Sequence, residues 1–431
     1  MKKRVLRVVS AALVFALTLG MTACSSGTGS ASSTGSAASG QVSTNLASAG
    51  VTQVKFWHYM SMDKEGAQVQ KIVDEYNASQ SRVKVIAQYI PRDELMKQYT
   101  IGAVSSDLPD VGCVDNPDNV SYASMGVFDD ITDLFKAWDE AKFLDGPLSS
   151  CKFEGKLYGI PWGSNCLGLF YDEDVLKEAN VSVPTTWSEL TAVCKKLTHG
   201  TQKGLAFSAV ANEEGTFQFM PFLLSAGGSA DNLASTNSIK ALNYFSSLVK
   251  SGYVSRECIN WTQADVEKQF ASGSAAMMIN GPWNIDGVKK DAPQKKWNVA
   301  KVPKADNGSY ASVLGGENLV ICKGAHKNAA WDFIKFIDSQ ENSARLCAKI
   351  GRFSPRSDVN IQEMFKNDPI MATFAQSMPT AKSRGPHVKW PEVSSAIQTA
   401  MQETITGKAT AQQSMMKAKA KVDKINASLK K

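Results

Sequence analysis

The chain has 431 residues, of which 43% are hydrophobic, 20% charged and 9% aromatic. This composition is typical of a folded globular protein and excludes collagen-like, disordered and multispanning membrane proteins, and the length predicts two or three domains. Four of the cations behind the formal charge of +6 lie within the first seven residues, which leaves +2 for the rest. We therefore expect no nucleic-acid partner.

Residues 1–23 combine a basic start, an apolar stretch over 8–19 and small residues, a pattern that predicts an export signal peptide. About twelve apolar residues are too few to cross a bilayer stably. The string Met-Thr-Ala-Cys24 resembles the lipobox of bacterial lipoproteins, which implies lipidation of Cys24. From Ser25 to Gly50, 22 of 26 residues are Ser, Thr, Gly or Ala, so residues 24–50 are expected to be a flexible tether.

Seven further cysteines lie in the body of the chain. None is spaced as CxxC, and several lie inside apolar runs, as in Val320-Ile321-Cys322. This pattern favours buried reduced thiols, although the count leaves room for one internal disulfide in an oxidising envelope.

The first elements after the tether alternate between strand and helix. Residues 54–57 are a short strand candidate, and apolar residues at 69, 72, 73 and 76 follow the spacing of an amphipathic helix. Residues 83–89 then alternate between apolar and polar side chains, as a strand does. Strand, helix and strand form a βαβ unit, which predicts a sheet flanked by helices.

The same alternation continues to the C-terminus. We expect strands at 167–171, 275–279 and 319–322, and helices at 174–179, from Asn328, and through most of the last ~40 residues. Thr186 and Glu189 have the spacing of a capping box and predict another helix start. No internal repeat or heptad run is present, which excludes solenoids and coiled coils.

The enzyme motifs that a sequence can reveal are absent. No phosphate-binding glycine loop, serine elbow or metal-ligand spacing is found, and none of the four His is spaced as a ligand, so we expect no metal and no cofactor. A pair of catalytic carboxylates leaves no sequence motif, so an extracellular glycosidase stays open as an alternative.

Four tryptophans, at 57, 162, 283 and 390, lie beside expected strand ends or Gly/Pro turns. Open α/β sheets present ligand contacts at such loops, and flat aromatic rings suit the apolar faces of sugars. For each single Trp, packing at the end of the core is an equal alternative.

The segment 271–283, with its Asn-Gly-Pro-Trp end, resembles the signature of the family 1 extracellular solute-binding proteins. These are the carbohydrate-binding subunits of ABC importers, to which the maltose-binding protein belongs. Six further short strings match in family order, and together they cover nearly everything after Val51: 108–111, 155–161, 169–172, 184–190, 314–319 and 330–334.

The resemblance implies an α/β, two-lobed, type II periplasmic-binding-protein-like fold with a ligand cleft between the lobes. The expected first lobe comprises residues 51–163 and 298–345, and the second comprises 164–297 and 346–431. Crossings near 160–165, Trp297 and Ile350 would form a multi-segment hinge. Gly159, Gly163 and Gly351 are available there for backbone rotation.

The resemblance also implies ligand contacts at particular residues. Trp283 follows the Gly-Pro turn and is the first candidate for a stacking platform. The remaining candidates are Trp390, Phe217, Glu317, Asp115, Asn116, Asn165, Tyr59 and Arg352. Similar proteins place a carboxylate near Asn165, and Arg352 could instead pair with a structural carboxylate.

The expected function is therefore that of a substrate-binding lipoprotein of an ABC importer. It would act as a monomer on the outer face of the cytoplasmic membrane, held by lipid on Cys24, capture a carbohydrate, most plausibly an oligosaccharide, and deliver it to a permease driven by an ATPase. The alternatives are a binding protein for a polyamine, peptide or glycerol phosphate, a glycosidase, and a tethered structural protein. An anionic ligand would require several Arg or Lys in the cleft.

Overall fold

The structure is a computed structural model that describes residues 50–61 and 64–429. From Gly50 onward the chain forms one compact unit. The expected signal peptide, Cys24 and all but the last residue of the expected tether lie outside the described residues. Within the described ranges, no helix is both long enough and apolar enough to cross a membrane.

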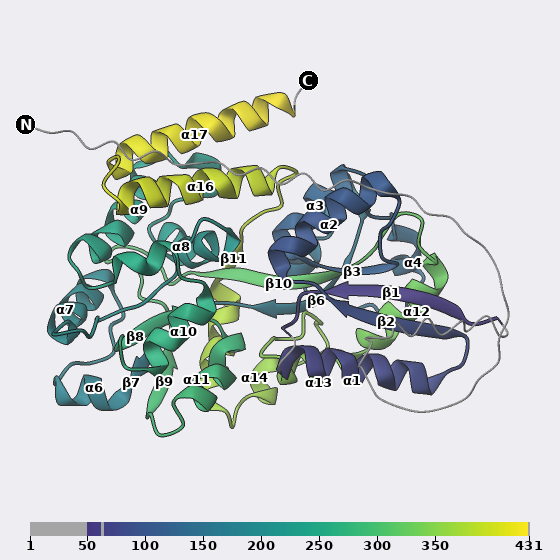
Figure 1. Ribbon diagram of the computed structural model, residues 1–431, viewed down its shortest axis with the longest axis horizontal. Helices are drawn as coiled ribbons and strands as arrows, with labels where there is room; N and C mark the ends of the chain where they lie inside the picture. The colour runs from purple at the N-terminus through teal and green to yellow at the C-terminus, as the bar shows by residue number, and fades with distance from the viewer. Residues whose placement is uncertain (1–49, 62–63, 430–431) are drawn as a thin grey trace, which may run out of the picture. The chain divides into compact units, whose positions relative to one another are not determined.

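A first sheet of six strands organises one lobe of this unit (Figure 1). Its order is β11, β10, β3, β1, β2, with β6 paired to β10. Strand β1 is parallel to its two neighbours, β2 and β3, whereas β10 runs antiparallel to β3 and β6. The strands are β1 (Thr52–His58), β2 (Val83–Tyr89), β3 (Val111–Asp115), β6 (Ile160–Asn165), β10 (Ser312–Ile321) and β11 (Ala381–Ser383).

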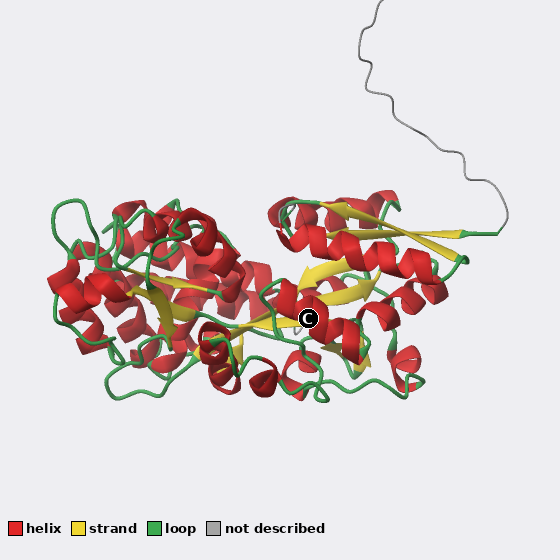
Figure 2. Cartoon of the chain, turned by 90° about the horizontal axis from the view of Figure 1, so that it is seen from below, coloured by secondary structure: helices red, strands yellow, loops and turns green. Residues whose placement is uncertain are grey.

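Helices cover both faces of the first sheet (Figure 2). Successive side chains of a strand point to opposite faces, so Phe56 packs with α1 and α12 while Trp57 packs with α2 and α3. This first lobe contains α1 (Lys64–Ser79), α2 (Arg92–Ser105), α3 (Asn116–Ser124), α4 (Thr132–Lys136), α5 (Asp145–Ser149), the hairpin β4 (Lys152–Phe153) and β5 (Lys156–Leu157), α12 (Lys327–Ile337) and α13 (Gln340–Lys349).

The second lobe is built on a three-stranded antiparallel sheet. Its central strand β7 (Gly168–Asp172) pairs with β8 (Met277–Asn280) and β9 (Trp297–Ala300). Leu169 packs in the cluster of α7, α8, α9, α16 and α17, whereas Phe170 packs on the other face with α10 and α15. The α-helices are α6 (Glu173–Glu178), α7 (Trp187–Leu197), α8 (Glu213–Ser225), α9 (Thr236–Lys250), α10 (Gln263–Ala271), α11 (Ile285–Asp291), α14 (Ile361–Met364), α15 (Pro369–Ser377), α16 (Trp390–Ile405) and α17 (Ala411–Ser428).

Four short 3₁₀ helices complete the described part of the second lobe and its edge. They are η1 (Ala230–Asn232), η2 (Arg256–Ile259), η3 (Pro282–Asn284) and η4 (Met378–Thr380). Among them, η3 is the turn that carries Trp283.

The lobes are joined by β6, by β10 and by the segment 350–353. β10 pairs with β3 through its C-terminal half, and Val313 near its start belongs to the second-lobe core (Figure 1). The segment 350–353 runs beside β6, because Ser164 and Phe353 exchange backbone hydrogen bonds of 2.8 and 2.7 Å. Of the three expected hinge glycines, Gly351 has a positive φ of 63°, a conformation that glycine adopts without strain.

Two boundaries of the expected partition need correction. Trp297 lies in β9 inside the second-lobe sheet, so the crossing expected there lies in β10 instead. Val302 and Ala305 also pack in the second-lobe core, which assigns about 298–313 to the second lobe. Leu346 and Ile350 pack with the first lobe, so that lobe continues to about residue 350.

The expected secondary-structure elements are confirmed. The βαβ unit appears as β1, α1 and β2. The apolar segments at 167–171, 275–279 and 319–322 overlap β7, β8 and β10, respectively. Thr186 and Glu189 form the predicted capping box at the start of α7. The seven cysteines from Cys113 to Cys347 are buried and unpaired, in agreement with the favoured interpretation.

Candidate functional site

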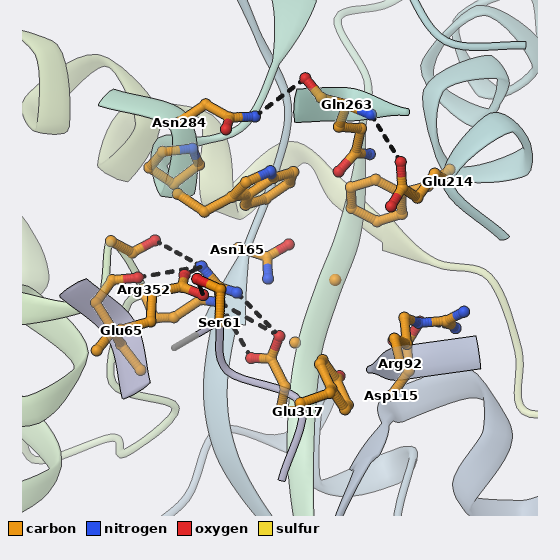
Figure 3. Close-up of a pocket in the computed structure, with 18 of the residues that line it drawn as sticks. Ser61, Glu65, Arg92, Asp115, Asn165, Glu214, Gln263, Asn284, Glu317 and Arg352 are labelled. Atoms are coloured by element: carbon orange, nitrogen blue, oxygen red, sulfur yellow. Dashed lines mark hydrogen bonds and ion pairs between the residues drawn. The ribbon is translucent and has the colours of Figure 1, made fainter. Parts of the chain in front are cut away.

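A cavity of about 410 Å³ opens between the two lobes. Its walls come from the segments after β1 and β8, from the last residue of β3, from the N-terminal ends of α2 and α8, and from the crossing strands β6 and β10. Figure 3 shows polar groups of the second lobe, Asn284, Gln263 and Glu214, on one side of the space and those of the first lobe on the other. A volume of this size is within the range of small-molecule sites.

Two glycines of β10 allow the walls to approach each other. A Cβ at Gly315 would lie 2.2 Å from Asn165 Oδ1 and 2.7 Å from Phe217 Cζ. A Cβ at Gly316 would lie 2.0 Å from the carbonyl oxygen of Gly163. Only glycine therefore lets β6 and the Phe217 ring pack directly against β10 at the base of the cavity.

Two aromatic side chains of the second lobe form a corner of the cavity. The rings of Phe217, on α8, and Trp283, on η3, have centroids 6.1 Å apart and planes tilted by 49°. Each ring also carries a guanidinium group over its face: Arg384 lies 4.6 Å from the Phe217 centroid and Arg352 lies 5.3 Å from that of Trp283. These cation–π contacts hold the corner in place.

Arg352 is the centre of one ion-pair network. Its Nε donates to Glu317 Oε2 at 3.1 Å, and its Nη1 donates to Glu65 Oε1 and the Ile350 carbonyl at 3.2 and 3.1 Å. Burial opposes the charge, yet the two carboxylates raise the pKa of Arg352 above its usual value. The guanidinium therefore stays charged while its donors are directed at protein groups.

Arg384 is the centre of a second network. It donates to Asp115 Oδ1 at 2.6 Å and to Glu213 Oε1 at 2.6 Å, and its Nη2 also donates to Asn116 Oδ1 at 3.0 Å. Arg92 adds a 2.9 Å bond to Asp115 Oδ2. Burial alone would raise the pKa of Asp115, but the two arginines hold it below its usual range.

Burial disfavours the ionised form of two carboxyl groups at or near the cavity. Burial raises the pKa of Asp118 to about 7, with Asp115 adding to the shift and Arg92, 3.4 Å away, opposing it. Burial also raises the pKa of Glu214, whose Oε2 accepts a 2.7 Å bond from the Gln263 backbone. Both groups are poised to respond to pH.

Asn165 lines the cavity and has a buried acceptor without a partner in the described ranges. It lies at the end of β6 between the two walls (Figure 3), is 5% exposed, and its Oδ1 has no hydrogen-bond partner among the described residues. The Nε of Arg384 is likewise buried without a partner in that part of the chain. A hydroxyl group can both donate and accept, so a polyhydroxylated ligand supplies both kinds of partner.

Seven of the nine expected ligand-binding residues line this cavity. They are Tyr59, Asp115, Asn165, Phe217, Trp283, Glu317 and Arg352. Successive members of this set are 34 to 66 positions apart in the sequence, and the fold brings them together. Their contact with ligand stays a prediction.

Asn116 and Trp390 are not among the lining residues, which corrects their expected placement. Trp390 is 1% exposed in the second-lobe core, where its Nε1 donates to Glu213 Oε1 at 3.1 Å. Asn116 is 5% exposed and its Oδ1 accepts from Arg384. Both side chains stand behind the wall and contact residues that form it.

Sequence analysis missed most of the charged wall. Arg92, Glu65, Glu213 and Glu214 lie in the first turns of helices, next to the cavity. Asn212, an N-cap residue whose side chain accepts from the Glu214 backbone, marks the start of α8 and was the one available signal. No grouping of three His, Cys, Asp or Glu in the described residues is arranged to hold a metal ion.

Comparison with known proteins agrees with this architecture. The maltotriose-binding protein of Pyrococcus abyssi is 24% identical over 377 residues, 84% of this chain and 79% of that protein. A Thermotoga lettingae ABC transporter solute-binding protein, solved with alpha-D-tagatose, gives a TM-score of 0.80 at 24% identity, covering 87% of this chain and 99% of that one. Mycobacterium tuberculosis UgpB, solved with glycerophosphocholine, gives 0.77 at 18%, covering 89% and 100%.

A family model described as that of a bacterial extracellular solute-binding protein matches residues 71–373, well over half of the chain. The matched range includes the second-lobe sheet, four of the six strands of the first sheet and most of the cavity wall. The chain belongs to the family of bacterial extracellular solute-binding proteins.

Proposed function

We propose that this protein captures a carbohydrate between its two lobes and delivers it to the permease of an ABC importer. One relative is named for the binding of maltotriose, and one similar structure holds alpha-D-tagatose. In this proposal, lipid on Cys24 holds the protein at the outer face of the cytoplasmic membrane, and a partner ATPase supplies the energy of transport.

The observation that carries the proposal is the composition of the cavity wall. A tilted aromatic corner, Phe217 and Trp283, lies beside the unpartnered acceptor of Asn165. The aromatic faces suit the C–H faces of a sugar ring, and the acceptor suits a hydroxyl. Carboxylate oxygens of Glu317 and Asp115 border the same space and can accept further hydroxyl bonds.

The charges of the wall favour a neutral sugar over an anionic ligand. Four cationic and six acidic side chains line the cavity. Each of the three arginines, Arg92, Arg352 and Arg384, already pairs with two carboxylates. Their number alone would suggest an anion site, but their pairing compensates the charge of all three, which leaves Lys349 as the remaining cation of the wall for a phosphate or a uronate.

Capture depends on a difference in affinity between two states of the protein. A ligand that contacts both walls stabilises the closed arrangement by the contacts it makes only there. Closure would exclude water from the cavity and strengthen the hydrogen bonds to the sugar. The sugar would leave unchanged, so oligosaccharides incubated with the protein should release no new reducing ends, whereas turnover would favour the glycosidase alternative.

A thermal-shift screen tests the proposal. The panel contains neutral mono- and oligosaccharides, sugar phosphates, a polyamine and glycerophosphocholine. A ligand at about 100-fold its Kd stabilises the folded chain by about 2.7 kcal/mol, which is a readily measured shift. A shift with neutral sugars is expected, and a shift only with glycerophosphocholine, a phosphate or a polyamine would overturn the carbohydrate assignment.

A further inference from the structure

Arg384 connects the two lobes through its own side chain. In the first lobe it makes two bonds to Asp115, at 2.6 and 3.1 Å, and in the second lobe it bonds Glu213 at 2.6 Å and stacks on Phe217. Its side chain is 2% exposed, and those of Asp115 and Glu213 are each 10% exposed. Buried charge-assisted bonds of this kind are stronger than exposed pairs.

Glu213 is held in place from behind by α16. Trp390 Nε1 donates to its Oε1 at 3.1 Å, and Ser394 Oγ donates to its Oε2. Trp390 and Ser394 are each 1% exposed. Both oxygens of Glu213 are therefore occupied, which fixes the direction in which the carboxylate meets Arg384.

We propose that Arg384 is a clasp that sets the angle between the lobes in the ligand-free protein, and that Trp390 is a positioning residue that acts through Glu213. The clasp is independent of the identity of the ligand. It lies beside the crossing strands, because Asp115 is the residue that pairs with Glu317 of β10.

Loss of the guanidinium would leave two buried carboxylates facing the same space from opposite lobes. Arg92 still neutralises Asp115, but the remaining polar partners of Glu213 are neutral. An uncompensated buried carboxylate recovers hydration when the lobes separate. The ligand-free lobes of an Arg384→Met variant should therefore stand further apart and vary more in angle.

Pulsed EPR on the ligand-free full chain measures this separation. Spin labels are placed at Val104→Cys on α2 and Lys250→Cys on α9, two exposed positions on different lobes. Cys24 is replaced by serine in every variant, and the seven described native cysteines are buried and shielded from the label. Arg384→Met is compared with Arg345→Met, which breaks the half-buried pair of Arg345 with Glu75 inside the first lobe.

The clasp predicts a longer and broader label distance in Arg384→Met and an unchanged distance in Arg345→Met. Trp390→Phe keeps the buried ring and removes its donor, so it should shift the distance in the same direction by less. An unchanged distance in a folded Arg384→Met chain overturns the proposal. If that variant fails to fold, Trp390→Phe decides alone, since a purely structural Trp would lower melting temperature without moving the distance.

Discussion

Replacing Trp283 by alanine tests whether this side chain is a platform for the ligand or only packs against its neighbours in the protein. The half-buried indole contacts the Arg352 guanidinium at 5.3 Å and the Phe217 ring at 6.1 Å. Losing these contacts should lower the free energy of unfolding by about 1–3 kcal/mol. A sugar ring that covers on the order of 60–100 Å² of the indole contributes about 1.5–2.5 kcal/mol at 25 cal/mol per Å². Together with lost aromatic contact, binding should weaken roughly 10- to 150-fold.

Titration calorimetry with the best ligand of the screen, read beside the melting temperature, measures both effects. Trp297→Ala is the matched control: Trp297 is also half-buried in the second lobe and stacks on Phe170 at 5.5 Å, but it does not line the cavity. The control should lose stability and keep its affinity. An equal loss of affinity in both variants, or no loss in Trp283→Ala, would refute the platform.

Three further predictions concern polar groups. Asn165→Ala should weaken ligand binding by about 0.5–1.5 kcal/mol in calorimetry with little change in melting temperature, because its Oδ1 has no partner among the described residues. Arg352→Met should lower the free energy of unfolding in urea by about 3–5 kcal/mol, since it leaves Glu317 buried without its cation; a loss below 1 kcal/mol would contradict this. Because burial raises the pKa of Asp118 to about 7, the folded chain keeps a proton that the unfolded chain loses, so stability should fall as pH rises from about 4 to about 7. Asp118→Asn should flatten that profile in chemical denaturation, and an unchanged slope would count against the raised pKa.

The fold was predictable where its signals are local. The amphipathic spacing of α1, the alternation of β2 and the capping box of α7 are each contained in a few consecutive residues, and each is confirmed. Local patterns do not state which sheet a strand joins. The sequence analysis expected a crossing near Trp297, and only the pairing of β9 with β7 assigns this strand and the following residues to the second lobe.

The two candidate platforms show the same limit at the site. Trp283 and Trp390 both stand beside a turn at the start of a helical segment, and their immediate sequences do not distinguish them. The difference is tertiary: η3 places Trp283 at the cavity, whereas α16 places Trp390 in the core behind Glu213. A Trp beside a turn therefore predicts which segment lies near the site, but it does not predict whether the side chain itself lines the cavity.

The pairing of the charged side chains at the site is the feature that depends most strongly on the fold. Arg384 and Asp115 are separated by 269 positions, and Arg352 and Glu65 by 287. The sequence shows how many arginines lie in segments that reach a cleft. It does not show whether each guanidinium group is free to bind an anion or already paired with a carboxylate, and these two cases predict different ligands. Each of the three arginines at the cavity pairs with two carboxylates. Their guanidinium groups are therefore held in place by protein groups and are not free to bind an anion. The aromatic corner and the amide side chains of the wall, such as Asn165 and Asn284, are then the basis for expecting a ligand that is recognised by its C–H faces and hydroxyls.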